Sequence, residues 1–125
     1  MICYSREGSP KPDRTPVLML STVTNSEKER QFIVANAKDD RSIIVDFIDY
    51  IRAFDPDVVV SFGANAVDWA YLRGRCRKLG LKLVFDRAGI ELHSSIYGHV
   101  STTGIVNLDL ADFMDVFPEV KVHTL

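Results

Sequence analysis

The sequence predicts an α/β fold, in which an antiparallel meander is followed by a parallel strand and helices flank the mixed sheet. Three observations predict it. Two β-rich runs at residues 17–23 and 31–36 flank a polar turn, which is typical of a hairpin. Apolar residues then recur at helical spacing across residues 43–54. A valine run at residues 58–60 is apolar on both faces, as expected of a central strand covered on both sides.

The chain opens with a connection rich in Gly, Ser, Pro and Lys, MICYSREGSPKPDRTP. Pro10, Pro12 and Pro16 each lack a backbone N–H donor, so regular strand pairing is excluded through most of this stretch. Only its first few residues can be the end of a strand. We therefore expect a long, exposed connection into the strand at residues 17–23.

The next element is predicted to be an amphipathic helix, for which Asp39 or Asp40 can serve as the N-cap. Pro56 stops the helix because proline cannot continue its hydrogen bonding. Charged residues occupy one face, and the opposite face is apolar. The predicted apolar face consists of Ile43, Ile44, Phe47, Ile48, Ile51 and Phe54.

A second helix is predicted after Gly63, with Asn65 as its N-cap and Gly80 as its end. Its basic residues are expected around the faces that point away from the core. These residues are Arg73, Arg75, Arg77 and Lys78. The predicted buried stripe consists of Trp69, Leu72, Cys76 and Leu79.

The remaining chain is β-leaning over residues 81–110, with Gly89, Gly98 and Gly104 as breaks. The stretch ADFMDVF is expected to form a short helix before Pro118. A meander followed by helix, strand and helix is the order of a ribonuclease-H-like sheet. Such an order says little about function on its own.

Composition sets the class of protein. The chain has 125 residues, of which 46% are hydrophobic and 26% charged, so we expect one soluble globular domain. Fifteen basic and seventeen acidic residues leave a net charge of −2, so any phosphate-binding surface must be local.

No apolar run approaches the roughly 20 residues needed to cross a bilayer. Cys3 and Cys76 lack the spacing of a zinc site or a disulfide framework. We expect a cytoplasmic protein with no membrane contact.

Five stretches of the sequence carry a family resemblance: CYSREGSPKPDRTPVLMLS, FIDYIRAFDPDVVVSF, NAVDWAYL, KLGLKL and YGHVSTTGIVNLDL. They resemble, in order, successive blocks of the 3′ to 5′ proofreading exonuclease domain of family B DNA polymerases, especially the archaeal members. The resemblance covers nearly the whole chain. It implies that residues 1–125 are a single exonuclease-like domain and a fragment of a larger polymerase-type protein.

The resemblance also implies a cofactor and partners. In that family, carboxylates from three motifs hold two Mg²⁺ or Mn²⁺ ions, because hard divalent ions prefer oxygen ligands. One ion orients and deprotonates the attacking water, and the other stabilises the leaving 3′ oxygen. Mg²⁺ or Mn²⁺ is therefore expected here if any site is retained. The implied partners are single-stranded DNA or a primer terminus and the remaining polymerase domains.

The second family motif is typically Tyr-Asn, three residues, then Phe-Asp. At those positions this chain has Phe62 and Gly63, then Val67 and Asp68. The resemblance thus makes Asp68 the candidate catalytic and metal-binding carboxylate. Glycine lacks the amide side chain expected near the DNA end, and valine offers less surface against bases than phenylalanine. The candidate nucleic-acid contacts are Phe62, Gly63, Asn65 and Tyr71.

The other two motifs lack their acids. The first, Asp-Ile-Glu, falls at the start of this chain, where Ile2 stands next to Cys3 in place of the glutamate. An apolar residue cannot replace a hard oxygen ligand. The third motif is a tyrosine followed four residues later by aspartate, and no tyrosine of this sequence has that spacing. The sequence therefore predicts a chain that lacks autonomous exonuclease activity.

Several of these residues have simpler interpretations. The helix dipole stabilises a first-turn carboxylate such as Asp68 whether or not it binds metal. Trp69 is expected in the core, whereas Tyr71 is a candidate for either core or base stacking. The four basic residues of the second helix would contact phosphate, or they are favoured there by the dipole alone. Two roles stay open for Asp109: a further carboxylate that approaches the sheet edge or, favoured over it, a carboxylate that caps a helix or faces solvent. The histidines match no metal pattern and are assigned no role: His93, His99 and His123.

Three functions remain open from the sequence. The first is an active metal-dependent 3′ to 5′ exonuclease, which needs further carboxylates. The second is a degenerate exonuclease-like domain that is kept for nucleic-acid binding or as a purely structural, interaction module. The third is a domain fragment completed by the rest of a polymerase. In an isolated chain, unpaired sheet edges predict self-association.

Overall fold

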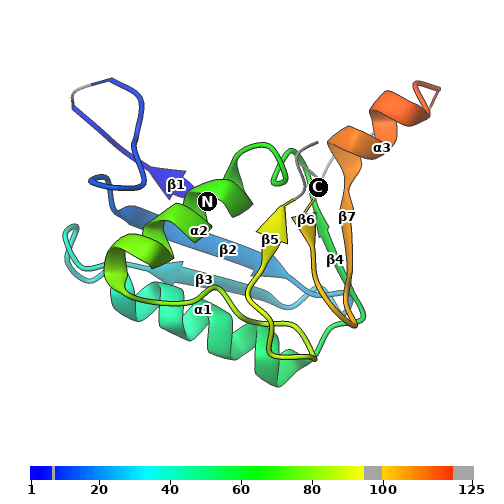
Figure 1. The fold of residues 1–125 in the computed structure, drawn as a ribbon, viewed down its shortest axis with the longest axis horizontal. Helices are drawn as coiled ribbons and strands as arrows, with labels where there is room; N and C mark the ends of the chain where they lie inside the picture. The colour runs from blue at the N-terminus through cyan, green and yellow to red at the C-terminus, as the bar shows by residue number, and fades with distance from the viewer. Residues whose placement is uncertain (7, 95–99, 120–125) are drawn as a thin grey trace.

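An antiparallel meander forms the N-terminal part of the fold, as predicted (Figure 1). Strand β2 (Val17–Val23) pairs with β3 (Glu29–Ile33) along its length and with β1 (Ile2–Cys3) at one end. Strand β3 begins two residues earlier than predicted. The structure, a computed structural model, describes residues 1–6, 8–94 and 100–119.

The early start of β3 has a local cause. The backbone N–H of Thr24 donates to the carbonyl of Lys28, and the N–H of Lys28 donates to Oγ1 of Thr24. These bonds close the turn at residue 28, so pairing with β2 starts at Glu29 although that residue is polar. Polar residues are accommodated because only Phe32 of this strand is buried.

Helix α1 (Arg41–Phe54) packs against β2 and β3 and carries the predicted apolar face, with one exception. Five of the six predicted residues are buried, but Phe54 is exposed. It is the last residue of the helix, and its ring stacks on Tyr50 at 6.2 Å between centroids. Asp40 stands at the N-cap position, as predicted, but its side chain makes no capping hydrogen bond.

The valine run forms strand β4 (Val58–Ser61), which pairs in parallel with β7 (Val106–Asp109). The expectation that β4 is covered on both faces is wrong for the described residues. Val58 and Val60 are 48% and 54% exposed. Among the described residues β7 is the only strand hydrogen-bonded to β4. An apolar face of this two-stranded sheet is therefore open.

Helix α2 (Asp68–Leu79) begins two residues later than an N-cap at Asn65 would place it. The N-cap position is Val67, because the Asn65 side chain is bonded elsewhere. The helix ends at Gly80 in the left-handed conformation, as predicted. Trp69, Leu72 and Cys76 form the buried stripe, with Leu79 only partly buried.

The segment after α2 contains less strand than its β-leaning composition predicts. Residues 81–92 form no strand; β5 (His93–Ser94) and β6 (Val100–Ser101) make a short antiparallel pair before β7. Helix α3 (Leu110–Val116) ends before Pro118, as expected. Within the described residues, no helix has the length and apolar character needed to cross a membrane. In Figure 1, α3 extends away from the remainder of the fold.

Candidate functional site

The loop that joins β4 to α2, residues 62–67, lies at the carboxyl ends of the two parallel strands. Ser61 at the end of β4 is the register partner of Asp109 at the end of β7. Chains leave a parallel sheet at this edge, and ligand sites of α/β folds are found there. The loop carries three of the four candidate nucleic-acid contacts and leads directly into Asp68.

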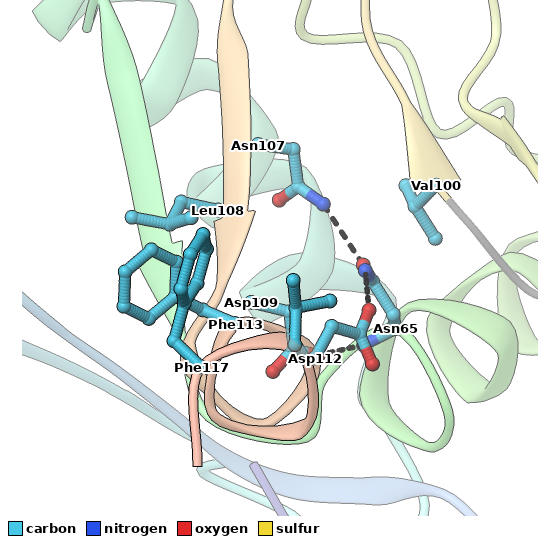
Figure 2. Close-up of a pocket in the computed structure, with 9 residues that line it drawn as sticks. Asn65, Val100, Asn107, Leu108, Asp109, Asp112, Phe113 and Phe117 are labelled. Atoms are coloured by element: carbon cyan, nitrogen blue, oxygen red, sulfur yellow. Dashed lines mark hydrogen bonds between the residues drawn. The ribbon is translucent and has the colours of Figure 1, made fainter. Parts of the chain in front are cut away.

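The Asp109 carboxylate fixes the shape of this loop (Figure 2). Its Oδ1 accepts a hydrogen bond from the Gly63 N–H at 2.7 Å, and its Oδ2 accepts one from the Asn65 N–H at 2.8 Å. Oδ1 also accepts from the Ala111 N–H at 3.0 Å, which caps α3. Asp109 is only 3% exposed. The expectation that Asp109 caps a helix is confirmed, and the loop contacts were not predicted.

The Asn65 side chain adds a second connection between the loop and the β7–α3 segment. Its Nδ2 donates to Oδ2 of Asp112 at 2.9 Å, and its Oδ1 accepts from Nδ2 of Asn107 at 2.8 Å. These groups border an open cavity of about 310 Å³ beside α3. Figure 2 shows its other lining residues, which are mainly apolar and include Val100, Leu108, Phe113 and Phe117.

The four candidate nucleic-acid contacts are placed differently from one another. Phe62 is 51% exposed, and its ring is accessible at the start of the loop. Gly63 has a φ of 72°, a left-handed conformation that glycine adopts without strain, and its N–H is used by Asp109. The Asn65 side chain is occupied by Asp112 and Asn107. Their role as contacts stays a prediction.

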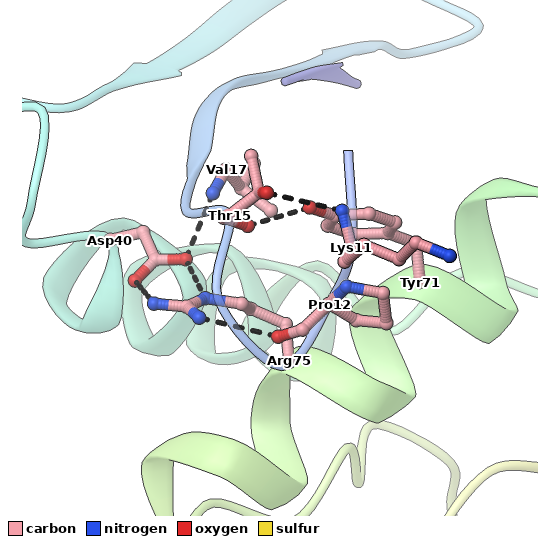
Figure 3. A network of polar contacts seen from close by, with 7 residues as sticks. All are labelled: Lys11, Pro12, Thr15, Val17, Asp40, Tyr71 and Arg75. Carbon is pink, nitrogen blue, oxygen red and sulfur yellow. Dashed lines mark hydrogen bonds and ion pairs between the residues drawn. The ribbon is translucent and has the colours of Figure 1, made fainter. Parts of the chain in front are cut away.

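Tyr71, the fourth candidate, is half-buried and contacts the N-terminal connection (Figure 3). Its hydroxyl donates to the carbonyl of Thr15 at 2.6 Å. Burial, with a further contribution from Cys3, raises the pKa of Tyr71 to about 12. The hydroxyl is therefore a neutral structural donor at physiological pH.

Asp68 lies in the first turn of α2, half-buried and within electrostatic range of the N-terminal strand. The pKa of the Cys3 thiol is raised, mainly by burial and also by the negative charges of Asp68 and Asp40. The structure thus brings Asp68 near the strand where the first family motif would contribute its acids. The residues found there are Ile2, which is exposed, and Cys3, which is partly buried.

These residues do not fit a pair of divalent cations. No three His, Cys, Asp or Glu side chains in the described part of the chain are grouped so that they could hold a metal ion. The raised pKa keeps the Cys3 thiol protonated, and only a thiolate is an effective metal ligand. Mg²⁺ and Mn²⁺ require several oxygen ligands, and Asp68 by itself supplies one carboxylate.

One of the candidate phosphate contacts has a structural role. Arg75 is 6% exposed and forms a buried ion pair with Asp40 (Figure 3). The expectation that Arg75 lies on an outer face of α2 is therefore wrong, because its buried partner Asp40, at the N-cap of α1, satisfies its charge. Arg77 and Lys78 are exposed, as expected, and Arg73 is partly buried. Trp69 is in the core, in ring contact with Phe85.

The histidine within the described residues takes part in local bonding. His93 has its Nε2 3.0 Å from Oγ of Ser101, across the short β5–β6 pair. His99 and His123 lie outside the described residues.

Sequence reasoning missed two polar residues that shape the loop, Asn107 and Asp112. It singled out Asp109 but did not predict that Asp109 binds the loop. A signal was present for Asp109, because an aspartate between a strand and a helix is a common N-cap. Its position at the end of a parallel strand also places it beside the exit of the neighbouring strand. No signal of spacing or periodicity linked Asn65 to residues more than 40 positions away.

Comparisons with known proteins agree with this fold. Residues 1–124 match the family model for the exonuclease domain of DNA polymerase family B. DNA polymerase 2 of Aeropyrum pernix is 38% identical over 122 residues, which are 98% of this chain and 15% of the relative. The DNA polymerase of Archaeoglobus fulgidus is 32% identical over 120 residues, or 94% of this chain and 14% of the relative.

A solved structure shows the same fold. The family B DNA polymerase from the hyperthermophilic archaeon Pyrobaculum calidifontis superimposes with a TM-score of 0.86 at 44% identity, covering 98% of this chain and 16% of that one. The ribonuclease-H-like fold class predicted from the element order is thereby confirmed. This chain spans 14 to 16% of the length of these three proteins. The chain belongs to the family of exonuclease domains of family B DNA polymerases.

Proposed function

We propose that this chain is a nucleic-acid-associated, exonuclease-like domain that lacks autonomous 3′ to 5′ exonuclease activity. The observation that carries the proposal is the composition of the surface around Asp68. The neighbouring N-terminal strand offers an exposed isoleucine and a protonated thiol where carboxylates are needed. A single carboxylate cannot assemble two hard cations.

Divalent cations, where a site binds them, would supply the activated water and stabilise the leaving oxygen. The described residues do not provide the ligands, so no hydrolytic step is assigned to this chain. What the chain retains is the scaffold: the meander, the parallel strand pair and the loop that ends at Asp68. The scaffold supports binding without chemistry.

The proposed ligand is single-stranded DNA or a primer terminus. The net charge of −2 leaves no general attraction for DNA, so contact depends on local features. Phe62 provides an exposed aromatic ring, and base stacking on aromatic rings tolerates any sequence. The exposed basic residues at the end of α2, Arg77 and Lys78, are available for phosphate.

The proposed protein partners are further polymerase domains, with which residues 1–125 would work as one domain. The family match and the 14 to 16% share of the relatives' length support this proposal. Without those domains, two surfaces favour self-association: the open face of β4, and the outer edge of β3, which has no further strand partner among the described residues.

Degradation of a 5′-labelled single-stranded oligonucleotide in the presence of Mn²⁺ tests the proposal. We expect no hydrolysis by the wild-type chain or by Asp68→Ala, and binding by both without metal. Hydrolysis that Asp68→Ala abolishes would contradict the proposal and reveal an active exonuclease. Neither hydrolysis nor binding would leave a purely structural module.

A further inference from the structure

The loop of residues 62–67 is held from one side by a segment far away in the sequence. Asp109 binds the loop backbone at Gly63 and Asn65, and the Asn65 side chain binds Asn107 and Asp112. All three partners belong to the β7–α3 segment. We propose that Asp109 is a positioning residue, which holds this loop so that the Phe62 ring is presented to a nucleic-acid strand. The inference rests on the proposed function.

The first step of the argument is the fit of the carboxylate to its donors. Three backbone N–H groups, from Gly63, Asn65 and Ala111, point at two oxygens at 2.7 to 3.0 Å. Charge-assisted bonds of this kind are stronger than neutral ones, and Asp109 is buried from competing water. An asparagine at this position would keep only one acceptor oxygen. Its NH₂ group would take the place of the other oxygen and face a backbone N–H, which is also a donor. The site therefore requires the carboxylate itself.

The second step links the loop to the helix that follows it. The Val67 N–H donates to the Gly63 carbonyl at 3.3 Å, and the Trp69 N–H donates to the Ala64 carbonyl at 2.9 Å. The anchored Gly63 is thus bonded to the N-cap of α2, and its neighbour Ala64 to the first turn, which contains Asp68. Movement of residues 63–65 would be passed on to that turn.

The third step concerns what the anchored loop exposes. Phe62 and Val67 stand just before and just after the anchored residues, and both side chains are exposed. An aromatic ring held in water next to a rigid stretch of backbone loses little conformational freedom when a base stacks on it. If the loop were released, the ring would lose this preorganisation. The affinity for single strands would fall without the removal of any contacting atom.

A matched control is available in the same fold. Asp86 is also buried and also binds two backbone amides, those of Ile90 and Thr103, at 2.8 and 3.1 Å. It organises a different connection, between α2 and β7, and its hydrogen bonds within the described residues go to that connection and not to residues 62–67. Asp86→Asn should therefore destabilise the protein as Asp109→Asn does but leave the loop in place.

The experiment compares the wild type with Asp109→Asn, Asp86→Asn and Phe62→Ala, all in the 125-residue chain. Three quantities are measured: the melting temperature, the amide exchange rates of Gly63 and Asn65, and the metal-free affinity for a fluorescent oligo-dT. In Asp109→Asn we expect the two exchange rates to rise at least about tenfold. We expect its affinity to fall about fivefold or more, as in Phe62→Ala. Asp86→Asn should change only the melting temperature.

Asn107→Ala serves as a second variant if Asp109→Asn does not fold. It removes one partner of the Asn65 side chain and should reduce the affinity in the same direction. Equal affinity of the wild type and the folded loop variant would overturn the positioning role while the proposed function stands. Failure of the wild type to bind oligo-dT would overturn the proposed function, and the positioning role with it.

Discussion

Asp40 and Arg75 form a buried, two-pronged ion pair that joins the start of α1 to the middle of α2. The Arg75 Nε lies 2.6 Å from Oδ2 of Asp40, and Nη2 lies 3.0 Å from Oδ1. Oδ2 also accepts the Val17 N–H at 2.9 Å, and Nη1 of Arg75 donates to the Pro12 carbonyl at 3.2 Å. Two helices, the first long strand and the N-terminal connection therefore meet at one pair of charges (Figure 3).

Removal of one partner of this pair should be strongly destabilising. In Arg75→Met, Asp40 remains buried as an unpaired charge, so we expect the free energy of unfolding to fall by about 3–5 kcal/mol. Urea unfolding measures the change. Arg77→Met on the same helix is the control, because Arg77 is exposed and should tolerate the change. A loss for Arg75→Met no larger than that of the control would contradict the structural role.

The same pair predicts a dependence of stability on pH. Burial acts to raise the pKa of Asp40, but the hydrogen bonds from Arg75 and Val17 outweigh it and lower that pKa below its usual value. Because the folded-state pKa is below the unfolded one, the stabilisation is complete above the ordinary aspartate pKa of about 4. It is lost as the pH falls through the lowered folded-state pKa.

Melting temperatures recorded from neutral to acidic pH check this dependence. The wild type should lose stability on acidification more steeply than Asp40→Asn, which has no proton to bind at this position. Parallel curves for the two proteins would show that Asp40 contributes nothing to the acid response. The pH dependence that remains in the variant belongs to other carboxylates, such as Asp86, whose pKa is also lowered.

Gly74 should resist replacement by alanine although it lies inside a helix. In an exposed helix interior, alanine is more stabilising than glycine by about 1 kcal/mol. A Cβ at this position, however, would lie 2.9 Å from Cβ and 3.0 Å from Cγ of Pro12, a rigid ring in the N-terminal connection. Overpacking of this kind typically costs about 1–3 kcal/mol. We expect Gly74→Ala to lower the melting temperature, and a rise would show that the connection moves freely.

The open face of β4 predicts association of the isolated chain. Val58 and Val60 lie on one face of the strand, and Val106, the register partner of Val58, is exposed beside them. Sedimentation velocity should show oligomers for the wild type and a shift toward monomer for Val60→Lys. Ile90→Lys is the control, because Ile90 is exposed outside the strands. A monomeric wild type at high concentration would rule out this association.

Local rules in the sequence predicted most of the elements. Helix α1 and the end of α2 followed from apolar spacing and from Pro56 and Gly80, signals that act within one or two turns. The meander followed from two β-rich runs around a polar turn. The boundary of β3 was misplaced because the bonds between Thr24 and Lys28 set it, and side-chain composition does not report them.

The errors arose where tertiary partners override local preference. Asn65 would cap a helix in isolation, but Asp112 and Asn107 bind its side chain. The sequence pattern predicts Arg75 at the surface, but in the fold it is buried in an ion pair with Asp40. The valines of β4 would be covered in a wider sheet, but among the described residues only β7 pairs with that strand. The family resemblance located Asp68, and the structure added the contacts that hold its loop.

The anchoring of the 62–67 loop also has a kinetic consequence. The hydrogen bonds to Gly63 and Asn65 join residues 46 and 44 positions apart, and the pairing of β4 with β7 also joins distant parts of the chain. The meander and α1, in contrast, are built mostly from neighbouring stretches of chain. Because closing long loops delays contact formation, the meander and α1 are expected to form early. The loop beside Asp68 takes its final shape late, only after residue 109 has reached the sheet.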